Sequence, residues 1–224
     1  MTMQNVTKTF KGGRGVRDIS FTLEAGHINA LVGSNGAGKS TIIKLLTNLL
    51  KPDSGEIMLR DVRFMPDDIA FPDTLTAEEI IAYLGKLKKI PQAEQQAMLE
   101  KVGLVEAKKL KVGQFSKGMR QRLNLAQSLM GTGELFILDE PTNGLDPYWI
   151  AQLKALLEAE RARGQMILFS THLLSLAEEI ADQVIMIHHG EIIASGTIVD
   201  LLTTNNCKTL EQLWLQLTKQ EVQS

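Results

Sequence analysis

Short apolar runs separated by polar turns recur along this chain of 224 residues, and several of them have the length of buried strands. A polar-apolar alternation at 18–23 indicates a strand with one buried face. The turn residues at 188–190 lie between two apolar runs, which is the pattern of a β-hairpin. We predict further strands at 27–32, 56–60, 62–66, 135–138, 166–169, 184–187 and 191–194.

Apolar residues at helical spacing occupy much of the remaining chain. Thr76, followed three residues later by Glu79, is a capping-box signature for a helix start, and Gly103 is a typical helix stop. The predicted helices cover 41–46, 76–88, 91–102, 118–130, 147–163, 173–182 and 210–217. Between 74 and 130 the pattern is helical only, so we expect an all-helical segment inserted between strand-rich parts.

A glycine-rich motif lies between the strand at 27–32 and the helix that follows it. Residues 33–40 fit the P-loop pattern G-x-x-x-x-G-K-[ST] without a mismatch. The backbone N–H groups of such a loop form a nest for phosphate oxygens. Lys39 is then expected to reach the β- and γ-phosphates, and Ser40 to ligate Mg²⁺. A chance match in a glycine-rich turn is the alternative, which the flanking strand and helix make less attractive.

Two carboxylates follow the apolar run at 135–138, namely Asp139 and Glu140. Ligand-facing groups collect at the carboxyl ends of parallel strands. We expect Asp139 to hold Mg²⁺ and Glu140 to orient or deprotonate an attacking water. A solvated strand end is the alternative for a lone Asp-Glu pair, and the P-loop in the same chain favours the catalytic role.

Composition narrows the class of protein. Apolar residues make up 44% and charged residues 22% of the chain, as in a soluble globular protein. The net charge of −2 gives no electrostatic reason to expect nucleic acid as a partner. The single cysteine, Cys207, excludes an internal disulfide. No signal peptide and no apolar run of about 18 residues is visible, so a membrane role would need another protein to cross the membrane.

Several residues allow two interpretations. Phe10 either packs in a strand or offers a stacking surface for a nucleotide base. His172 is either structural or placed to donate a hydrogen bond to a γ-phosphate. The pair His188 and His189 suggests a metal, but no third ligand is evident, and a solvated turn is the simpler interpretation. The lysine-rich run at 108–111 is typical of a solvated face.

Four stretches together resemble the motifs of ABC ATPases. Residues 115–122, which read FSKGMRQR, resemble the signature motif, and 141–147 are similar to the D-loop with its lead-in. The stretch 170–172 resembles the switch-histidine loop, and Phe10 matches the aromatic A-loop position. The order of these motifs is that of the family, and the resemblance covers nearly the whole chain.

The resemblance implies an α/β fold with a RecA-like P-loop core, an antiparallel β-subdomain and an inserted helical subdomain. Residues 1–73 and 131–224 would form the core and β-subdomain, and 74–130 the helical subdomain. The implied ligands are ATP and Mg²⁺, with Lys39, Glu140 and His172 as catalytic residues. The implied cation ligands are Ser40, Asp67 and Asp139. The implied nucleotide contacts are Phe10, Gly33, Ser34, Asn35, Gly36, Ala37, Gly38, Lys39, Ser40, Thr41, Ser116 and Gly118.

The resemblance also implies a head-to-tail dimer, in which each ATP lies between one P-loop and the other subunit's signature loop. The partner is a second copy or a different ATPase subunit. Ser116 and Gly118 stand at a helix start, where the positive dipole end forms an anion site. The expected function is the ATPase subunit of a membrane exporter, cytoplasmic and held on the inner face of the membrane by separate permease subunits. The alternative is a soluble ABC ATPase with a regulatory role.

Three departures from the family pattern stand out. The signature reads FSKGM where LSGGQ is common, a variant that resembles ATPases paired with ABC-2-type export permeases. Asp67 stands at the Q-loop position, where Gln or occasionally Glu is usual. The stretch 60–64 is very short, so we expect a reduced β-subdomain.

Overall fold

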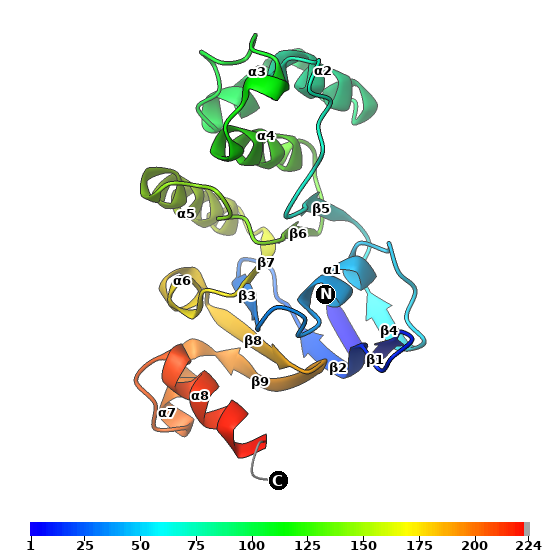
Figure 1. The fold of residues 1–224 in the computed structure, drawn as a ribbon, viewed down its shortest axis with the longest axis vertical. Coiled ribbons are helices and arrows are strands. Elements are labelled where there is room, and N and C mark those ends of the chain that lie inside the picture. The colour runs from blue at the N-terminus through cyan, green and yellow to red at the C-terminus, as the bar shows by residue number, and fades with distance from the viewer. Residues whose placement is uncertain (222–224) are drawn as a thin grey trace.

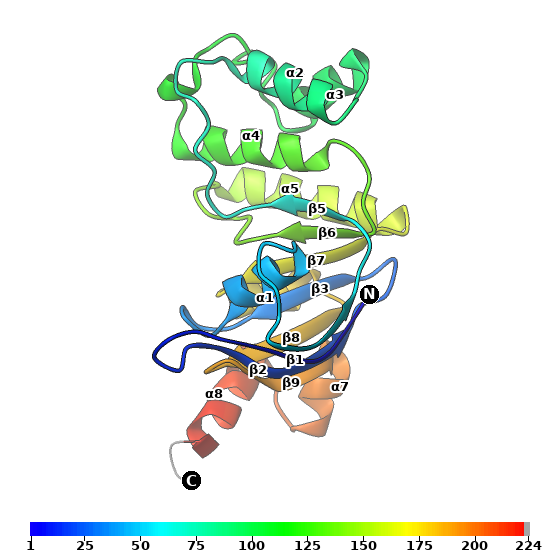
Figure 2. The ribbon, with the colours of Figure 1, turned by 90° about the vertical axis from the view of Figure 1, so that its right-hand side faces the viewer.

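The computed structural model describes residues 1–221, and a six-stranded sheet forms its centre (Figures 1 and 2). The strand order is β5-β6-β7-β3-β8-β9. Neighbouring strands are parallel except for the edge strand β9, which is antiparallel to β8. The strands are β3 (Ile28–Val32), β5 (Val62–Met65), β6 (Leu135–Leu138), β7 (Met166–Thr171), β8 (Gln183–His188) and β9 (Glu191–Thr197).

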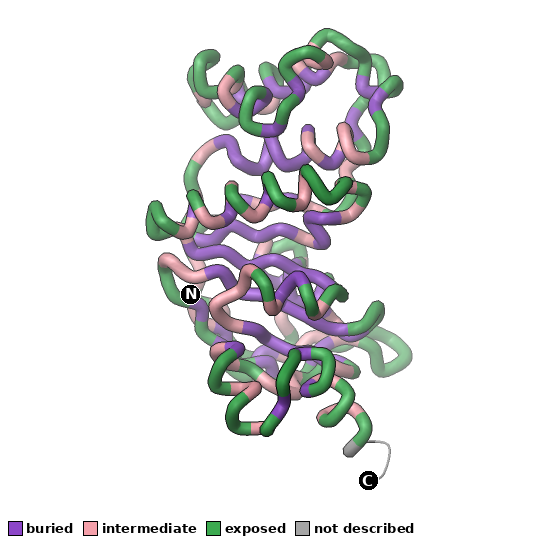
Figure 3. Tube along the Cα trace, turned by 90° about the vertical axis from the view of Figure 1, so that its left-hand side faces the viewer, coloured by how far each residue is buried: buried purple, intermediate pink, exposed green. Residues whose placement is uncertain are grey.

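The central strands are covered on both faces. Every residue of β3, β6 and β7 is buried, which Figure 3 shows as a continuous buried band. Alternate residues point to opposite faces of a sheet. Accordingly, Phe136 and Leu138 join a core cluster with the helical segment, whereas Leu135 and Ile137 join a cluster with helix α1 (Lys39–Leu46).

A second sheet of three antiparallel strands has the order β2-β1-β4. Its strands are β1 (Thr2–Thr9), β2 (Gly15–Thr22) and β4 (Ser54–Met58). We predicted the last strand at 56–60, two residues too late. Gly55 explains the earlier start: its φ is 85°, and a Cβ there would lie 2.4 Å from the carbonyl oxygen of Asn5. Ser54, which precedes the predicted strand, therefore already pairs with Thr7 of β1.

The segment expected to be all-helical contains α2 (Ala77–Leu87), α3 (Gln92–Lys101), a short 3₁₀ helix (Val112–Gln114) and α4 (Lys117–Leu129). These helices lie together at one end of the molecule (Figure 1). The predicted capping box is present, with Thr76 N donating to Glu79 Oε2 at 2.8 Å and Glu79 N donating to Thr76 Oγ1 at 3.2 Å. The mixed α/β fold expected from the sequence is thus confirmed, and within this segment the 3₁₀ helix was not predicted.

In the described chain, four helices follow β6, namely α5 (Pro147–Ala162), α6 (Leu174–Ile180), α7 (Ile198–Thr204) and α8 (Leu210–Glu221). Of these, α7 was not predicted. The predicted hairpin is present, because His189 and Gly190 both adopt positive φ, as a two-residue type I′ turn requires. Within residues 1–221, every helix is too short or too polar to span a bilayer.

Candidate active site

The glycine-rich loop joins β3 to α1, as predicted. Gly38 has a φ of 119°, and a Cβ there would lie 2.7 Å from Cγ1 of Val16. A Cβ at Gly33 would lie 2.5 Å from the carbonyl oxygen of Ile187. The loop can therefore follow this path only with glycine at both positions. Its N–H groups and the first turn of α1 form the edge of a cavity.

Lys39 is buried at the start of α1, and its ammonium group is held over the loop. Nζ donates to the carbonyl oxygen of Gly33 at 2.7 Å and lies 3.5 Å from Oε1 of Glu140. A buried ammonium group needs such partners because burial removes its hydration. The charge is therefore fixed where the phosphates of a nucleotide on this loop would lie.

The cavity above the loop has a volume of about 330 Å³, and most of the predicted ligand residues line it. Phe10 is 42% exposed and forms part of the wall, a placement compatible with base stacking. Arg14 and Gly15 also line the cavity, and neither was among the predicted nucleotide contacts. Their proximity to Phe10 in one glycine-rich loop was the available signal. The remaining wall residues are Ser34, Asn35, Gly36, Gly38, Lys39, Ser40, Thr41, Asp67, Asp139 and Glu140.

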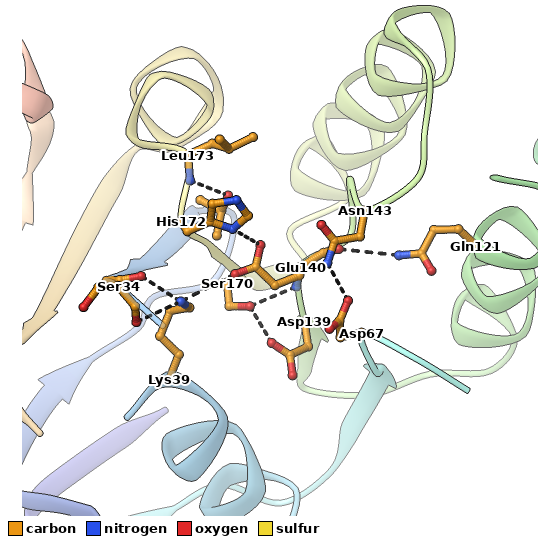
Figure 4. A network of polar contacts seen from close by, with 12 residues as sticks. Ser34, Lys39, Asp67, Gln121, Asp139, Glu140, Asn143, Ser170, His172 and Leu173 are labelled. Carbon is orange, nitrogen blue, oxygen red and sulfur yellow. Dashed lines mark hydrogen bonds and ion pairs between the residues drawn. The ribbon is translucent and has the colours of Figure 1, made fainter. Parts of the chain in front are cut away.

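Asp139 follows β6 and is held by Ser170 of the neighbouring strand β7. Oγ of Ser170 donates to Oδ1 of Asp139 at 2.6 Å and accepts from the backbone N–H of Glu140 at 2.9 Å (Figure 4). Burial raises the pKa of the Asp139 carboxyl, the carboxylates of Asp67 and Glu140 raise it further, and Ser170 and Lys39 oppose this. The site thus favours a cation beside Asp139.

Glu140 lies between the two other predicted catalytic residues. Its Oε2 lies 3.0 Å from Nδ1 of His172, and its Oε1 faces the ammonium group of Lys39. Glu140 is buried and has a positive φ of 45°, an uncommon conformation for a residue other than glycine. Gln121 of α4 supports the turn that follows, donating to the carbonyl oxygen of Pro141 at 3.3 Å. One carboxylate therefore bridges the P-loop lysine and the histidine.

The oxygen donors required for Mg²⁺ are present in the cavity wall. Ser40 offers a hydroxyl, and Asp67 and Asp139 offer carboxylates, which are the ligand types that Mg²⁺ prefers. Oδ1 of Asp67 already accepts a hydrogen bond from Asn143 at 2.6 Å. Among the described residues, no cluster of three His, Cys, Asp or Glu side chains would hold a metal ion by itself.

Ser116 and Gly118 lie apart from this cavity, at the start of α4. Ser116 is exposed and caps the helix, accepting from the backbone N–H of Met119 at 3.2 Å. Gly118 packs closely on Gly144, whose carbonyl oxygen would lie 2.8 Å from a Cβ at position 118. The stem of Lys117 lies close to Gly144, with its Cγ 2.8 Å from where a Cβ at position 144 would be. The chain does not bring its own signature loop to its own P-loop.

The two adjacent histidines occupy different places. His188 ends β8, half-buried, and its ring lies 5.6 Å from that of Trp214 in α8. His189 is exposed in the turn, with its ring 4.0 Å from that of His188. Trp214 also lines a small cavity with Gly33, Ser34 and His172. The C-terminal helix therefore packs behind the switch-histidine loop.

Known proteins of similar sequence carry the family name that the motifs of this chain resemble. The ABC transporter family model matches residues 16–143. The lantibiotic transport ATP-binding protein SrtF of Streptococcus pyogenes is 37% identical over 203 residues, covering 86% of this chain and 89% of that protein. The bacitracin transport ATP-binding protein BcrA of Bacillus licheniformis is 36% identical over 222 residues, covering 92% of this chain and 72% of that protein.

Solved structures extend the comparison to the fold. An ATP-binding subunit of an ABC transporter superposes with a TM-score of 0.89 at 28% identity, covering 97% of this chain and 98% of that one. A dimeric bacterial ABC transporter cassette superposes with a TM-score of 0.80 at 21% identity, covering 88% and 98%, and it shows the fold alone. The sequence and fold comparisons agree with the motifs, and the chain belongs to the ABC transporter family of ATP-binding proteins.

Proposed function

We propose that this protein hydrolyses ATP as the ATPase subunit of a membrane exporter. One observation carries the hydrolytic part: the Glu140 carboxylate lies between Lys39 and His172 at the end of the P-loop cavity. A carboxylate in this place can orient a water beside the γ-phosphate and take its proton as the oxygen attacks phosphorus. The products are ADP and phosphate.

The other residues of the cavity have separate tasks. Lys39 balances negative charge on the β- and γ-phosphate oxygens, and the loop N–H groups bind them. Nδ1 of His172 contacts Glu140. Its other ring nitrogen, Nε2, can donate a hydrogen bond to a phosphate oxygen when the ring is protonated. Ser40, Asp67 and Asp139 would hold Mg²⁺, which neutralises phosphate charge when bound. Phe10 and Arg14 provide the wall for the rest of the nucleotide.

The proposal includes a dimer with two ATP molecules at the interface. Ser116 and the first N–H groups of α4 form an exposed helix start with no acidic residue in its first turn. Such a helix end favours an anion. The γ-phosphate of ATP on the P-loop of a second subunit would provide that anion, so binding joins the subunits and hydrolysis releases them.

Export is the finer part of the proposal, and the names of SrtF and BcrA support it. The subunit would then lie on the inner face of the membrane, bound to a separate permease. The test is co-expression of the chain with a polytopic membrane protein encoded beside its gene. Isolation of an ATP-hydrolysing complex from membranes, whose transport stops in Glu140→Gln, supports export. ATP hydrolysis by a chain that does not bind this protein would favour the regulatory alternative.

A further inference from the structure

Asp67 lies between two cavities, and it is the only described residue that lines both. The first is the nucleotide cavity. The second has a volume of about 370 Å³ and lies between the stretch that begins at Asp67 and helix α4, with Asp68, Lys117 and Arg120 among its wall residues. A change in the position of the Asp67 side chain would therefore alter the walls of both cavities.

The backbone that leads to Asp67 is held firmly by α4. The buried amide of Asn124 donates to the carbonyl oxygen of Pro66 at 2.6 Å. Gln127 donates to the carbonyl oxygen of Phe64 at 3.3 Å and to Oδ1 of Asn124 at 3.1 Å. Because these bonds fix the strand end, the Asp67 side chain is the adjustable part of this stretch.

Asn143 fixes that side chain from the turn after Glu140. Its Nδ2 donates to Oδ1 of Asp67 at 2.6 Å, and its backbone N–H donates to the carbonyl oxygen of Glu140 at 3.1 Å (Figure 4). Within residues 1–221, Oδ2 of Asp67 has no hydrogen-bond partner. A neutral amide occupies one oxygen without cancelling the negative charge, so the carboxylate can still bind a cation.

We propose that Asn143 is a positioning residue for the cation that accompanies ATP. Its amide holds Oδ1 of Asp67, so that the second carboxylate oxygen is available to the cation beside Asp139. The backbone N–H of Asn143, which donates to the carbonyl oxygen of Glu140, ties the cation site to the backbone of Glu140. This inference rests on the proposed function, because it requires a nucleotide and a divalent cation in the cavity.

The test measures cation binding without turnover. The full chain is loaded with an ATP analogue that carries a β,γ-imido bridge, and Mn²⁺ binding is followed by electron paramagnetic resonance. The variants are Asn143→Ala, Asp67→Ala and the double variant. Asn205→Ala is the matched control, because Asn205 is also half-buried and donates one side-chain hydrogen bond, to Leu201 at 2.8 Å, far from the cavity.

Asn143→Ala should weaken Mn²⁺ binding by roughly 3- to 10-fold, the effect of losing one typical hydrogen bond. The loss should disappear when Asp67 is already alanine, since the two residues act as one unit. Analogue affinity in EDTA should not change, and Asn205→Ala should behave as wild type.

Three results would overturn the inference. They are unchanged Mn²⁺ affinity in Asn143→Ala, additive losses in the double variant, or weaker analogue binding in EDTA, which would mark Asn143 as structural only. Failure of the proposed function has a different signature: the wild-type chain would not bind the analogue at all.

Discussion

Oγ of Ser170 lies 2.6 Å from Oδ1 of Asp139 and donates a hydrogen bond to it, although the two residues are 31 positions apart in the sequence. Both stand at the carboxyl ends of neighbouring parallel strands. The same hydroxyl accepts from the backbone N–H of Glu140, so one buried serine orients both acidic residues.

Ser170→Ala should therefore impair both stability and catalysis. It leaves the buried N–H of Glu140 and the carboxylate of Asp139 without this partner, at a cost of about 1–3 kcal/mol in the free energy of unfolding. Urea unfolding measures this loss, and the Mg²⁺ concentration needed for half-maximal ATPase activity should rise. The control is Ser128→Ala, because Ser128 is equally buried and its Oγ donates only to the carbonyl oxygen of Leu125. An unchanged Mg²⁺ requirement in Ser170→Ala would contradict the assigned role.

Asp139→Asn should stabilise the protein when nucleotide and cation are absent. Burial, with the carboxylates of Asp67 and Glu140, raises the pKa of Asp139 above its ordinary value of 3.8, so the folded state holds this proton more tightly than the unfolded chain. Stability is therefore lost as pH rises from 3.8 to the raised pKa, and the loss is complete above it. Melting temperatures should favour the variant at pH 7, and the difference should vanish below about pH 3.8. A variant that is less stable than wild type at pH 7 would contradict the predicted direction of the stability change.

Lys39→Ala should weaken ATP binding, since the phosphates lose a buried cationic partner. We expect a loss of about 2–3 kcal/mol, or roughly 30- to 150-fold in affinity, measured by isothermal titration calorimetry. Lys44→Ala is the matched control, because Lys44 lies exposed on the same helix and its loss changes the net charge equally. Similar affinity losses in the two variants would mean that only the overall charge matters.

Ser116→Arg should block ATP-driven dimerisation and leave ATP binding by the monomer intact. The arginine would fill the helix start where the phosphate of the second subunit is expected. Size-exclusion chromatography with light scattering, in a Glu140→Gln background with ATP, measures the dimer. Because Ser116 is an N-cap, Thr197→Arg serves as the control for loss of a helix cap. Thr197 is the N-cap of α7, and its Oγ1 accepts a hydrogen bond from the backbone N–H of Asp200 at 3.1 Å. Reduced ATP binding by the Ser116→Arg monomer would argue against a shared site.

The parts of the site that the sequence made predictable are local in the chain. The P-loop is one continuous motif between a strand and a helix, and Asp139 and Glu140 directly follow an apolar run. Strand positions were also predictable, because buried strands are short apolar runs. The strand β1 was not among the predicted strands, and β4 begins two residues before its predicted start, because Gly55 allows a close approach to the backbone of Asn5.

The parts that escaped prediction depend on register and on distant pairs. Ser170 faces Asp139 because Leu138 pairs with Phe169. This register cannot be predicted from the sequence of either strand alone. The Asp67–Asn143 bond joins residues 76 positions apart. Helix α7, which was not predicted, begins directly after β9 with no loop between them to mark a helix start.

The most direct test of the account is single-turnover ATP hydrolysis by Glu140→Gln compared with Glu160→Gln. Both glutamates are buried and paired with a cation, Glu160 with Arg63 at 2.6 Å, but only Glu140 faces the P-loop cavity. We predict that Glu140→Gln retains ATP and hydrolyses it at least about 100-fold more slowly than wild type, since the water loses its base. Glu160→Gln should be less stable yet hydrolyse ATP at nearly the wild-type rate. Hydrolysis by Glu140→Gln at the wild-type rate would contradict the central claim.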